Sequence, residues 1–196
     1  TKKDKLNNLK EILDLEKIKN AVIFCNRKLD INKVSQFLKN NNFKTVSLHG
    51  DMNQSSRILS LEEFKSGAAK ILIASDVAAR GLDVAGLSHV FNYDVPTNAE
   101  DYIHRIGRTG RAGLSGKAFT LYEEDDEKNI LAIEKLINKK INFFNLRDTK
   151  DKSLDKETKN KTFELTSKKK NFKIPPIENF TNFQDSGNIP AFLTKT

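Results

Sequence analysis

The amino-acid sequence predicts an α/β domain in which a parallel sheet carries helices on both faces. From about residue 4 to about residue 140, short apolar runs of strand character alternate with longer segments of helical period. Strands that alternate with helices of this length favour parallel pairing. Polar segments at 49–51, 75–83 and 93–96 all follow predicted strands, and in such sheets ligands bind beside the carboxyl ends of the strands. The sequence therefore places its chemistry at one edge of the sheet.

Each element is predicted from its own pattern of apolar residues. A short apolar run predicts a buried strand at 21–25. Further strands are predicted at 45–48, 70–75 and 90–93, and an alternating pattern predicts a fifth at 117–122. Apolar residues at helical spacing predict an amphipathic first helix (Leu6, Leu9, Ile12, Leu13), a helix ending at 40–42 (Ile31, Val34, Phe37, Leu38), one over 54–65 (Ile58, Leu61, Phe64 on one side), a short one over 99–106 and a longer one over 123–138 (Ile130, Ile133, Leu136, Ile137 facing inward). Gly67 is placed to stop the third of these helices, and Pro96 closes the segment after the fourth strand.

Composition changes near residue 146 and divides the chain in two. Residues 1–146 are expected to form the folded domain. Residues 147–170 are dominated by Lys, Asp, Thr, Asn and Ser, so they cannot bury enough apolar surface to fold alone. We therefore expect 147–196 to be a lysine-rich, mostly disordered tail. It is interpreted as a solvated linker, with added RNA affinity or a short partner-binding end at 189–193 as alternatives.

Charge and cysteine content narrow the class of protein. The net charge of +8 and the isoelectric point near 9.4 favour nucleic acid or another polyanion as partner, although excess lysine can also serve solubility alone. The single cysteine, Cys25, lies in an apolar strand, where a small buried side chain is expected and a cytoplasmic, reducing location is consistent. No apolar run is long enough to cross a membrane. We also expect no metal site of the protein's own, because no His/Cys/Asp ligand set is present.

A glycine-rich segment at 104–113 carries the sharpest chemical signal. Arg108 and Arg111 lie three residues apart and are flanked by glycines that let the backbone approach a ligand. Two guanidinium groups on such a loop suit a phosphoryl group, whose transition-state charge an arginine stabilises. The alternative is a turn whose arginines pair with local carboxylates.

The segment at 104–113 reads HRIGRTGRAG and resembles motif VI of the DEAD-box RNA helicases without a mismatch. Residues 75–83 (SDVAARGLD) resemble motif V, and 22–26 (VIFCN) resemble motif IV. His49-Gly50-Asp51 with Gln54 and Arg57 resembles the glutamine–arginine motif of the family. The resemblance covers residues 1–146 in motif order and implies the second, C-terminal RecA-like helicase domain, with wording closest to bacterial members.

The resemblance implies roles for individual residues. Arg108 and Arg111 match arginine fingers that reach the γ-phosphate of ATP, and His104 and Arg105 match residues that couple motif VI to its neighbours. Asp83 matches the carboxylate that binds the ATP ribose, and Gly81 a backbone position beside the nucleotide. The positions implied to contact the RNA backbone are Gly50, Gln54, Arg57, Ser75 and Arg80.

Simpler interpretations stand beside these roles. Asp83 could cap the turn after motif V, and Gln54 and Arg57 could form a solvated helix face. A helix beginning near residue 53 also offers free backbone N–H groups to a phosphate. Arg27 stands where motif IV usually has threonine, so an ionic contact to RNA would replace a hydroxyl. Ser75 keeps the hydroxyl of the threonine that motif V often has.

The sequence contains neither a phosphate-binding loop nor an Asp-Glu-Ala-Asp run. ATP and Mg²⁺ are therefore expected to be held mainly by an N-terminal RecA-like domain that these residues do not include, and the partners implied are that domain and RNA. We expect the full-length protein to be an ATP-dependent RNA helicase with RNA-stimulated ATPase activity, and this chain alone to be inactive. The alternatives are a non-catalytic RNA-binding or adaptor module with the same fold, and a DNA helicase or remodelling motor. The implied contacts are to the RNA backbone, so they specify no particular RNA sequence. The sequence predicts no particular oligomeric state.

Overall fold

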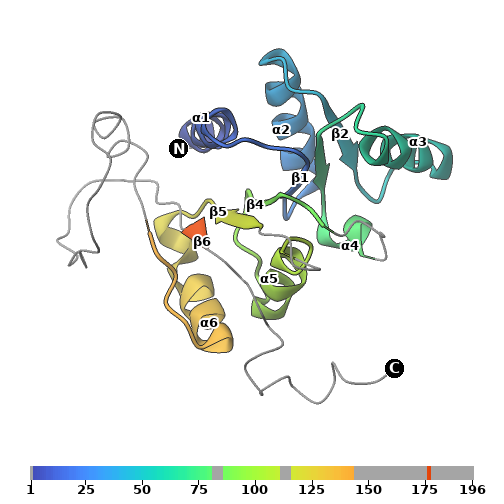
Figure 1. The fold of residues 1–196 in the computed structure, drawn as a ribbon. Helices are drawn as coiled ribbons and strands as arrows, with labels where there is room; N and C mark the ends of the chain where they lie inside the picture. The colour runs from blue at the N-terminus through green and yellow to red at the C-terminus, as the bar shows by residue number, and fades with distance from the viewer. Residues whose placement is uncertain (1, 81–85, 111–115, 144–175, 178–196) are drawn as a thin grey trace.

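The computed structural model describes residues 2–80, 86–110, 116–143 and 176–177, the side chains from Asp4 to Phe143 among them. One sheet runs through the described part of the chain in the order β2-β3-β1-β4-β5-β6 (Figure 1). Its strands are β1 Ala21–Phe24, β2 Thr45–Leu48, β3 Ile71–Ala74, β4 His89–Asn92, β5 Lys117–Thr120 and β6 Pro176–Ile177. The first five are parallel and in register, and only β6 pairs antiparallel, with β5. The parallel α/β sheet predicted from the sequence is therefore confirmed.

Helices follow the strands in the expected alternation. They are α1 Lys2–Leu15, α2 Lys28–Asn40, α3 Gln54–Lys65, α4 Asp76–Ala79, α5 Ala99–Ile106 and α6 Glu127–Ile137, with a 3₁₀ turn, η1, at Glu124–Asp126. The third helix begins where its N-cap predicts, because the Asn53 side chain accepts a hydrogen bond from the Ser56 amide at 2.8 Å. Beyond its end, Gly67 adopts a φ of 79°, a conformation that glycine enters without strain.

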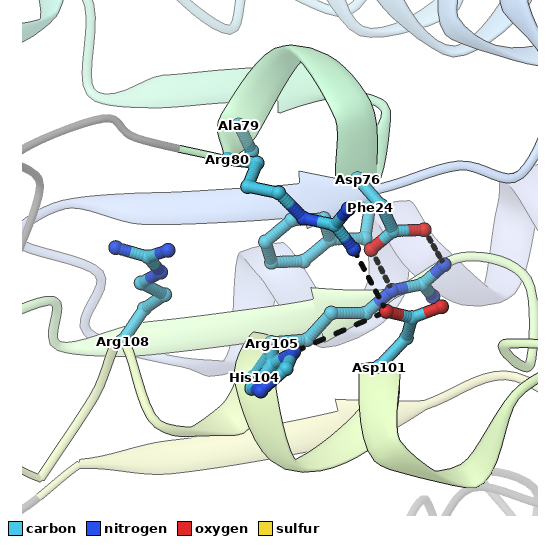
Figure 2. Close-up of a pocket in the computed structure, with 8 residues that line it drawn as sticks. All are labelled: Phe24, Asp76, Ala79, Arg80, Asp101, His104, Arg105 and Arg108. Atoms are coloured by element: carbon cyan, nitrogen blue, oxygen red, sulfur yellow. Dashed lines mark hydrogen bonds and ion pairs between the residues drawn. The ribbon is translucent and has the colours of Figure 1, made fainter.

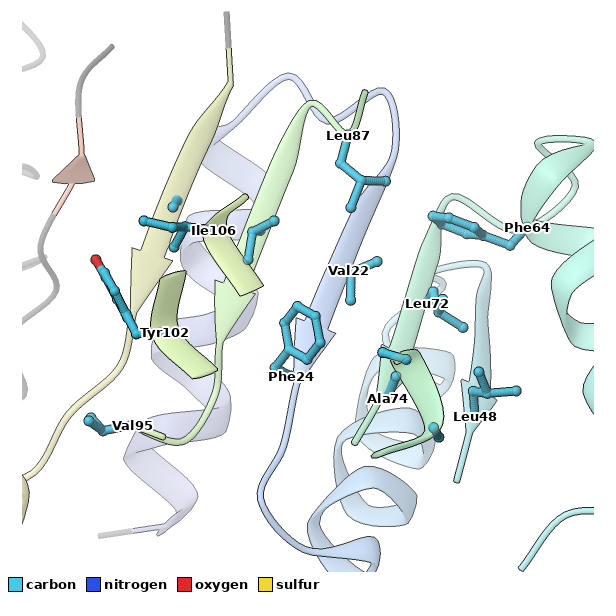
Figure 3. Packing of buried hydrophobic residues seen from close by; sticks show 14 of the residues in the cluster. Val22, Phe24, Leu48, Phe64, Leu72, Ala74, Leu87, Val95, Tyr102 and Ile106 are labelled. Atoms are coloured by element: carbon cyan, nitrogen blue, oxygen red, sulfur yellow. The ribbon is translucent and has the colours of Figure 1, made fainter. Parts of the chain in front are cut away.

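Helices cover both faces of the sheet (Figure 1). Each face has its own core, and Figure 3 draws part of the one that contains Val22 and Phe24. Alternate residues along every strand point to opposite faces, so β1 sends Val22 and Phe24 to one side and Ala21 and Ile23 to the other. The first face packs against α3, α4, α5 and α6, and the second against α1 and α2. Because both faces are covered, all residues of the central strands β1, β3 and β4 are buried.

Some local predictions were wrong. Ile58 was expected on the same side of α3 as Phe64 but is 47% exposed, whereas Phe64 is 6% exposed. Residues six apart on a helix point about 120° away from each other, so a stripe with a strict three-residue step drifts off the core. Leu136 was expected to face inward and is 45% exposed, because Ile130, Ile133 and Ile137 already form the buried stripe of α6.

The boundaries also differ from expectation. The long helix predicted at 123–138 begins as η1 and becomes α-helical only at Glu127. The short helix α4 and the strand β6 had no counterpart in the sequence prediction. The expected disorder of the tail concerns residues outside the described ranges, apart from the pair that forms β6. Among the described helices, none is long and apolar enough to cross a membrane.

Candidate functional site

A pocket of about 280 Å³ opens at the carboxyl edge of the sheet, between α4 and α5 (Figure 2). It is lined by residues from the end of β1 and from both helices: Phe24, Asp76, Ala79, Arg80, Asp101, His104, Arg105 and Arg108. Strands β1, β3 and β4 all end at this edge. The pocket therefore lies where a parallel sheet positions its ligands.

Arg105 is the centre of the pocket wall. The residue is only 1% exposed, and its guanidinium meets the carboxylate of Asp76 at two points, Nε to Oδ1 at 2.7 Å and Nη2 to Oδ2 at 2.6 Å. Two parallel charge-assisted bonds fix both the distance and the plane of the pair. The pair thus fastens α5 to α4.

The remaining donors of Arg105 reach the loops after two other strands. Nη2 also donates to Asn26 Oδ1 at 2.7 Å, and Nη1 donates to the Asp94 carbonyl at 2.8 Å and to Asn92 Oδ1 at 3.4 Å. Phe24 packs its ring 5.2 Å from the guanidinium carbon. All five N–H donors of an arginine therefore have acceptors, so this guanidinium holds the edge together and has none left for a ligand.

Asp94 forms a second junction beside the first. Its Oδ2 accepts a hydrogen bond from the Asn26 amide at 3.0 Å, and its Oδ1 accepts one from Lys5 Nζ at 3.1 Å. Lys5 is 5% exposed and also lies 4.9 Å from the centre of the Tyr93 ring. Burial of the phenol raises the pKa of Tyr93, and the negative charge of Asp94 raises it further. Through this carboxylate, α1 is tied to the loop after β1.

The mouth of the pocket is more exposed and carries looser polar contacts. Asp101 lies 3.5 Å from Arg80 Nη2 and 4.0 Å from His104 Nδ1. The Arg80 and His104 side chains are 71% and 63% exposed, so solvent weakens both contacts. Arg108 stands to the side of this group in Figure 2, one turn beyond Arg105. The arginines of 80, 105 and 108 thus share one pocket, but only Arg105 is enclosed.

The residues expected to face RNA lie along the same edge, and all but Arg80 lie outside the pocket lining. Gly50 follows β2, and Gln54 and Arg57 occupy the first turn of α3, with Gln54 exposed and Arg57 half-buried. Ser75 directly follows β3 and caps α4, because its hydroxyl accepts a hydrogen bond from the Ala78 amide at 3.4 Å. The structure brings these residues to neighbouring strand ends, and of the RNA-facing set only Arg80 also lines the pocket.

Two further ion pairs lie nearby. Arg27, at the start of α2, is 62% exposed and uses Nε to bind Asp30 at 2.7 Å. Lys28 pairs with Asp51, and this hydrogen bond lowers the pKa of the Asp51 carboxyl. The first pair joins the loop after β1 to α2, and the second joins the start of α2 to the loop after β2.

Three expected site residues, Gly81, Asp83 and Arg111, lie outside the described residues, so their roles stay predictions. Within the described ranges, no group of three or more His, Cys, Asp or Glu side chains is arranged to hold a metal ion. Cys25 is fully buried, and burial raises the pKa of its thiol.

The hydrogen-bond partners of Arg105 were not anticipated as functional. The sequence analysis assigned no role to Asp76, Asn26 or Asp94, although each lies within a polar stretch that follows a strand. The signal that could have found them is this shared position, because side chains at adjacent strand ends meet. Lys5 carried no such signal, since its partner is 89 residues away.

Comparisons with known proteins agree with this geometry. Residues 4–113 match the family model described as "Helicase conserved C-terminal domain". The DEAD-box ATP-dependent RNA helicase RhpA of Helicobacter pylori is 43% identical over 145 residues, which cover 74% of this chain and 30% of that protein. The ATP-dependent RNA helicase DBP8 of Candida albicans is 46% identical over 151 residues, 76% of this chain and 34% of that protein. The solved structure of the E. coli DEAD-box protein SrmB, bound to the regulator of ribonuclease activity A, superposes with a TM-score of 0.68 at 31% identity, over 71% of this chain and 82% of that one.

The parallel sheet with its arginine-lined pocket at the carboxyl edge, taken with these matches, is that of a C-terminal RecA-like helicase domain. The chain belongs to the helicase conserved C-terminal domain family, in the form found in DEAD-box RNA helicases. It spans about a third of the length of the curated relatives named above, at 30% and 34%. These relatives come from a bacterium and a fungus at similar identity, so the bacterial type expected from the sequence stays a prediction.

Proposed function

We propose that this chain supplies the C-terminal RecA-like domain of an ATP-dependent DEAD-box RNA helicase. The observation that carries the proposal is the set of hydrogen bonds made by the Arg105 guanidinium, here called the Arg105 junction. It joins the ends of β1, β3 and β4 into one rigid wall beside which Arg80, His104 and Arg108 gather. A wall of this kind positions cationic side chains for a phosphorylated ligand held against it by a second domain.

Arg108 is the described residue best suited to the phosphoryl group of ATP. It lines the pocket and follows α5 directly, so its backbone is fixed by the helix end while its long side chain reaches outward. A guanidinium beside a transferring phosphoryl group stabilises the charge of the transition state. Arg111, Gly81 and Asp83 complete this proposal from the family resemblance. ATP and Mg²⁺ would be held mainly by the N-terminal domain, since the chain has no phosphate-binding loop.

Arg105 acts as a positioning residue in this proposal, because every one of its donors is already used. His104 is exposed and within reach of Asp101, so it lies at the surface that would meet the second domain. Closure of the two domains on ATP would thus act on α5, because this helix carries both the buried Arg105 and the exposed His104.

The RNA would lie along the neighbouring strand ends. Gly50, Gln54 and Arg57 follow β2, and Ser75 and Arg80 flank α4. A cationic side chain, a hydroxyl and backbone N–H groups suit phosphates and sugars, so binding would show little sequence preference. Hydrolysis in the pocket and grip on RNA share α4, which joins the two surfaces.

The test is ATP hydrolysis by a two-domain protein in which this chain follows an ATP-binding RecA-like domain. That domain would be the one encoded ahead of the chain or, failing that, the one of the Helicobacter pylori relative. We expect RNA-stimulated ATPase activity in this two-domain protein, none in the 196-residue chain, and a loss of about 10³-fold in kcat for Arg108→Gln. The matched control is Lys65→Gln, a cation-to-glutamine change at the far end of α3. RNA binding without ATPase activity in the two-domain protein would instead identify an adaptor module.

A further inference from the structure

The backbone of Arg108 is held from two sides. Its amide donates to the carbonyl of Arg105 at 3.2 Å, which continues the end of α5. Its carbonyl accepts a hydrogen bond from the Leu87 amide, also at 3.2 Å. Leu87 lies just ahead of β4 and is 2% exposed within the core. The arginine is therefore anchored to the helix behind it and to the sheet beneath it.

Thr109 strengthens the attachment to Leu87. The two residues form a parallel β-bridge outside the named strands, and the Thr109 hydroxyl donates to the Leu87 carbonyl. The Thr109 amide donates in turn to Ile106 at 3.0 Å. Leu87 therefore uses both its amide and its carbonyl to hold the residues at 108 and 109.

Gly116 closes the arrangement from the other side. A Cβ atom at position 116 would lie 1.9 Å from Thr109 Oγ1, 2.6 Å from the Gly110 amide nitrogen and 2.9 Å from Thr109 Cβ. The Thr109 hydroxyl is bound to Leu87, and the amide nitrogen is backbone, so neither can swing aside as the end of a flexible side chain would. The residue just before β5 thus packs directly against Thr109 and Gly110, and only glycine leaves them room.

We propose that Leu87 and Gly116 form a clamp on Thr109, and that this clamp positions the Arg108 guanidinium for phosphoryl transfer. The inference rests on the proposed function, in which Arg108 meets the phosphoryl group. Neither clamp residue lines the pocket; each acts through the backbone that carries Arg108. Misplacing a reacting group by about 1 Å can cost about 10²-fold in rate. Displacement of Thr109 is therefore expected to lower kcat while ATP still binds.

The clamp is tested in the two-domain protein with three variants. Gly116→Ala forces Thr109 aside, and Thr109→Val removes the hydroxyl but keeps the size of the side chain. We expect both to lower kcat by about 10²-fold, with a much smaller change in the KM for ATP. Thr109→Ser keeps the hydroxyl and is expected to retain activity. Val34→Ala, in the core of the opposite face, controls for a loss of stability alone.

A second readout uses the 196-residue chain and needs no activity. We expect hydrogen exchange of the Leu87 amide to accelerate at least about tenfold in Gly116→Ala and Thr109→Val relative to Val34→Ala, because its acceptor is displaced. Unchanged exchange at Leu87, or a kcat within threefold of the parent in both variants, overturns the clamp. A parent two-domain protein without ATPase activity refutes the proposed function instead, and the exchange measurement then decides whether the clamp exists.

Discussion

The Arg105 guanidinium and the Asp76 carboxylate meet at two points, 2.7 and 2.6 Å apart, across 29 residues of sequence. The arginine side chain is fully enclosed, whereas the aspartate side chain is 27% exposed. The pair joins α4, which follows β3, to α5, which precedes Arg108. The two hydrogen bonds therefore hold the segment that resembles motif V against the segment that resembles motif VI.

Removing one member of this pair is expected to destabilise the fold. Asp76→Asn leaves an enclosed guanidinium with a neutral partner, and Arg105→Met leaves the acceptors around it without donors. Each change should lower the free energy of unfolding by about 3–5 kcal/mol, measured by urea denaturation of the 196-residue chain. Asp101→Asn, which touches only exposed partners, should change it by less than about 1 kcal/mol. Equal losses of unfolding free energy in Asp76→Asn and Asp101→Asn would show that the enclosed pair stabilises the fold no more than the exposed contacts do.

The Lys5–Asp94 pair is expected to couple α1 to the loop after β1. The side chains are 7% and 17% exposed, so Lys5→Met leaves a partly buried carboxylate without its cation. The double variant Lys5→Met/Asp94→Asn should be more stable than the sum of the single losses predicts, by about 1–3 kcal/mol. A full double-mutant cycle by urea denaturation measures this coupling. Additive losses would mean that the two side chains do not interact energetically.

Stability should depend on pH through His89. This histidine is 5% exposed at the start of β4, stacks on Phe91 and Phe119, and contacts Ser88 and Glu16. Burial lowers its pKa below the ordinary 6.5, although Glu16 opposes the shift. The unfolded chain then binds the proton more tightly than the folded chain. The stabilising contribution of His89 is complete above about pH 6.5 and shrinks as the pH falls toward the lowered pKa.

The measurement is urea denaturation of the parent chain and of His89→Gln between pH 5 and pH 8. The comparison cancels the titration of groups that both proteins share. We expect the advantage of the parent to be larger at pH 8 than at pH 5. An advantage that grows on acidification would mean that the contact with Glu16 outweighs burial.

Arg57 is expected to contribute one phosphate contact to RNA. Arg57→Ala should weaken the binding of single-stranded RNA and reduce the slope of log K against log salt by about 0.7, the value for one released counterion on a single strand. Lys65→Ala, on the same helix but at its other end, should leave the slope unchanged. Equal effects of the two variants would assign the binding to net charge alone.

Much of the fold follows from sequence because both faces of the sheet are covered. Strands such as 21–25 and 70–75 read as unbroken apolar runs, and the structure has them within one residue at each end. Helices with a stripe of mixed three- and four-residue steps, such as the one holding Leu9, Ile12 and Leu13, are buried as expected. The α3 stripe was partly wrong, because a regular three-residue step does not follow the helical period.

The candidate site could be predicted as a location but not as a set of contacts. Parallel strands bring the residues after them to one edge, so the polar segments that follow the strands could be expected at that edge. Which of their side chains would be enclosed depends on long-range packing. Nothing periodic links Asn26 to Arg105, 79 positions apart, and an arginine in a polar motif gives no sign that all its donors will be used internally.

The enclosure of Arg105 also bears on how the domain is assembled. Its acceptors come from segments 79, 29 and 13 residues earlier in the chain, so a newly made polypeptide can satisfy this cation only after β1, β3 and β4 have come together. Until then the guanidinium would have to stay hydrated, which keeps the sheet edge open. Formation of the pocket wall is consequently tied to the pairing of β1 with β3 and with β4.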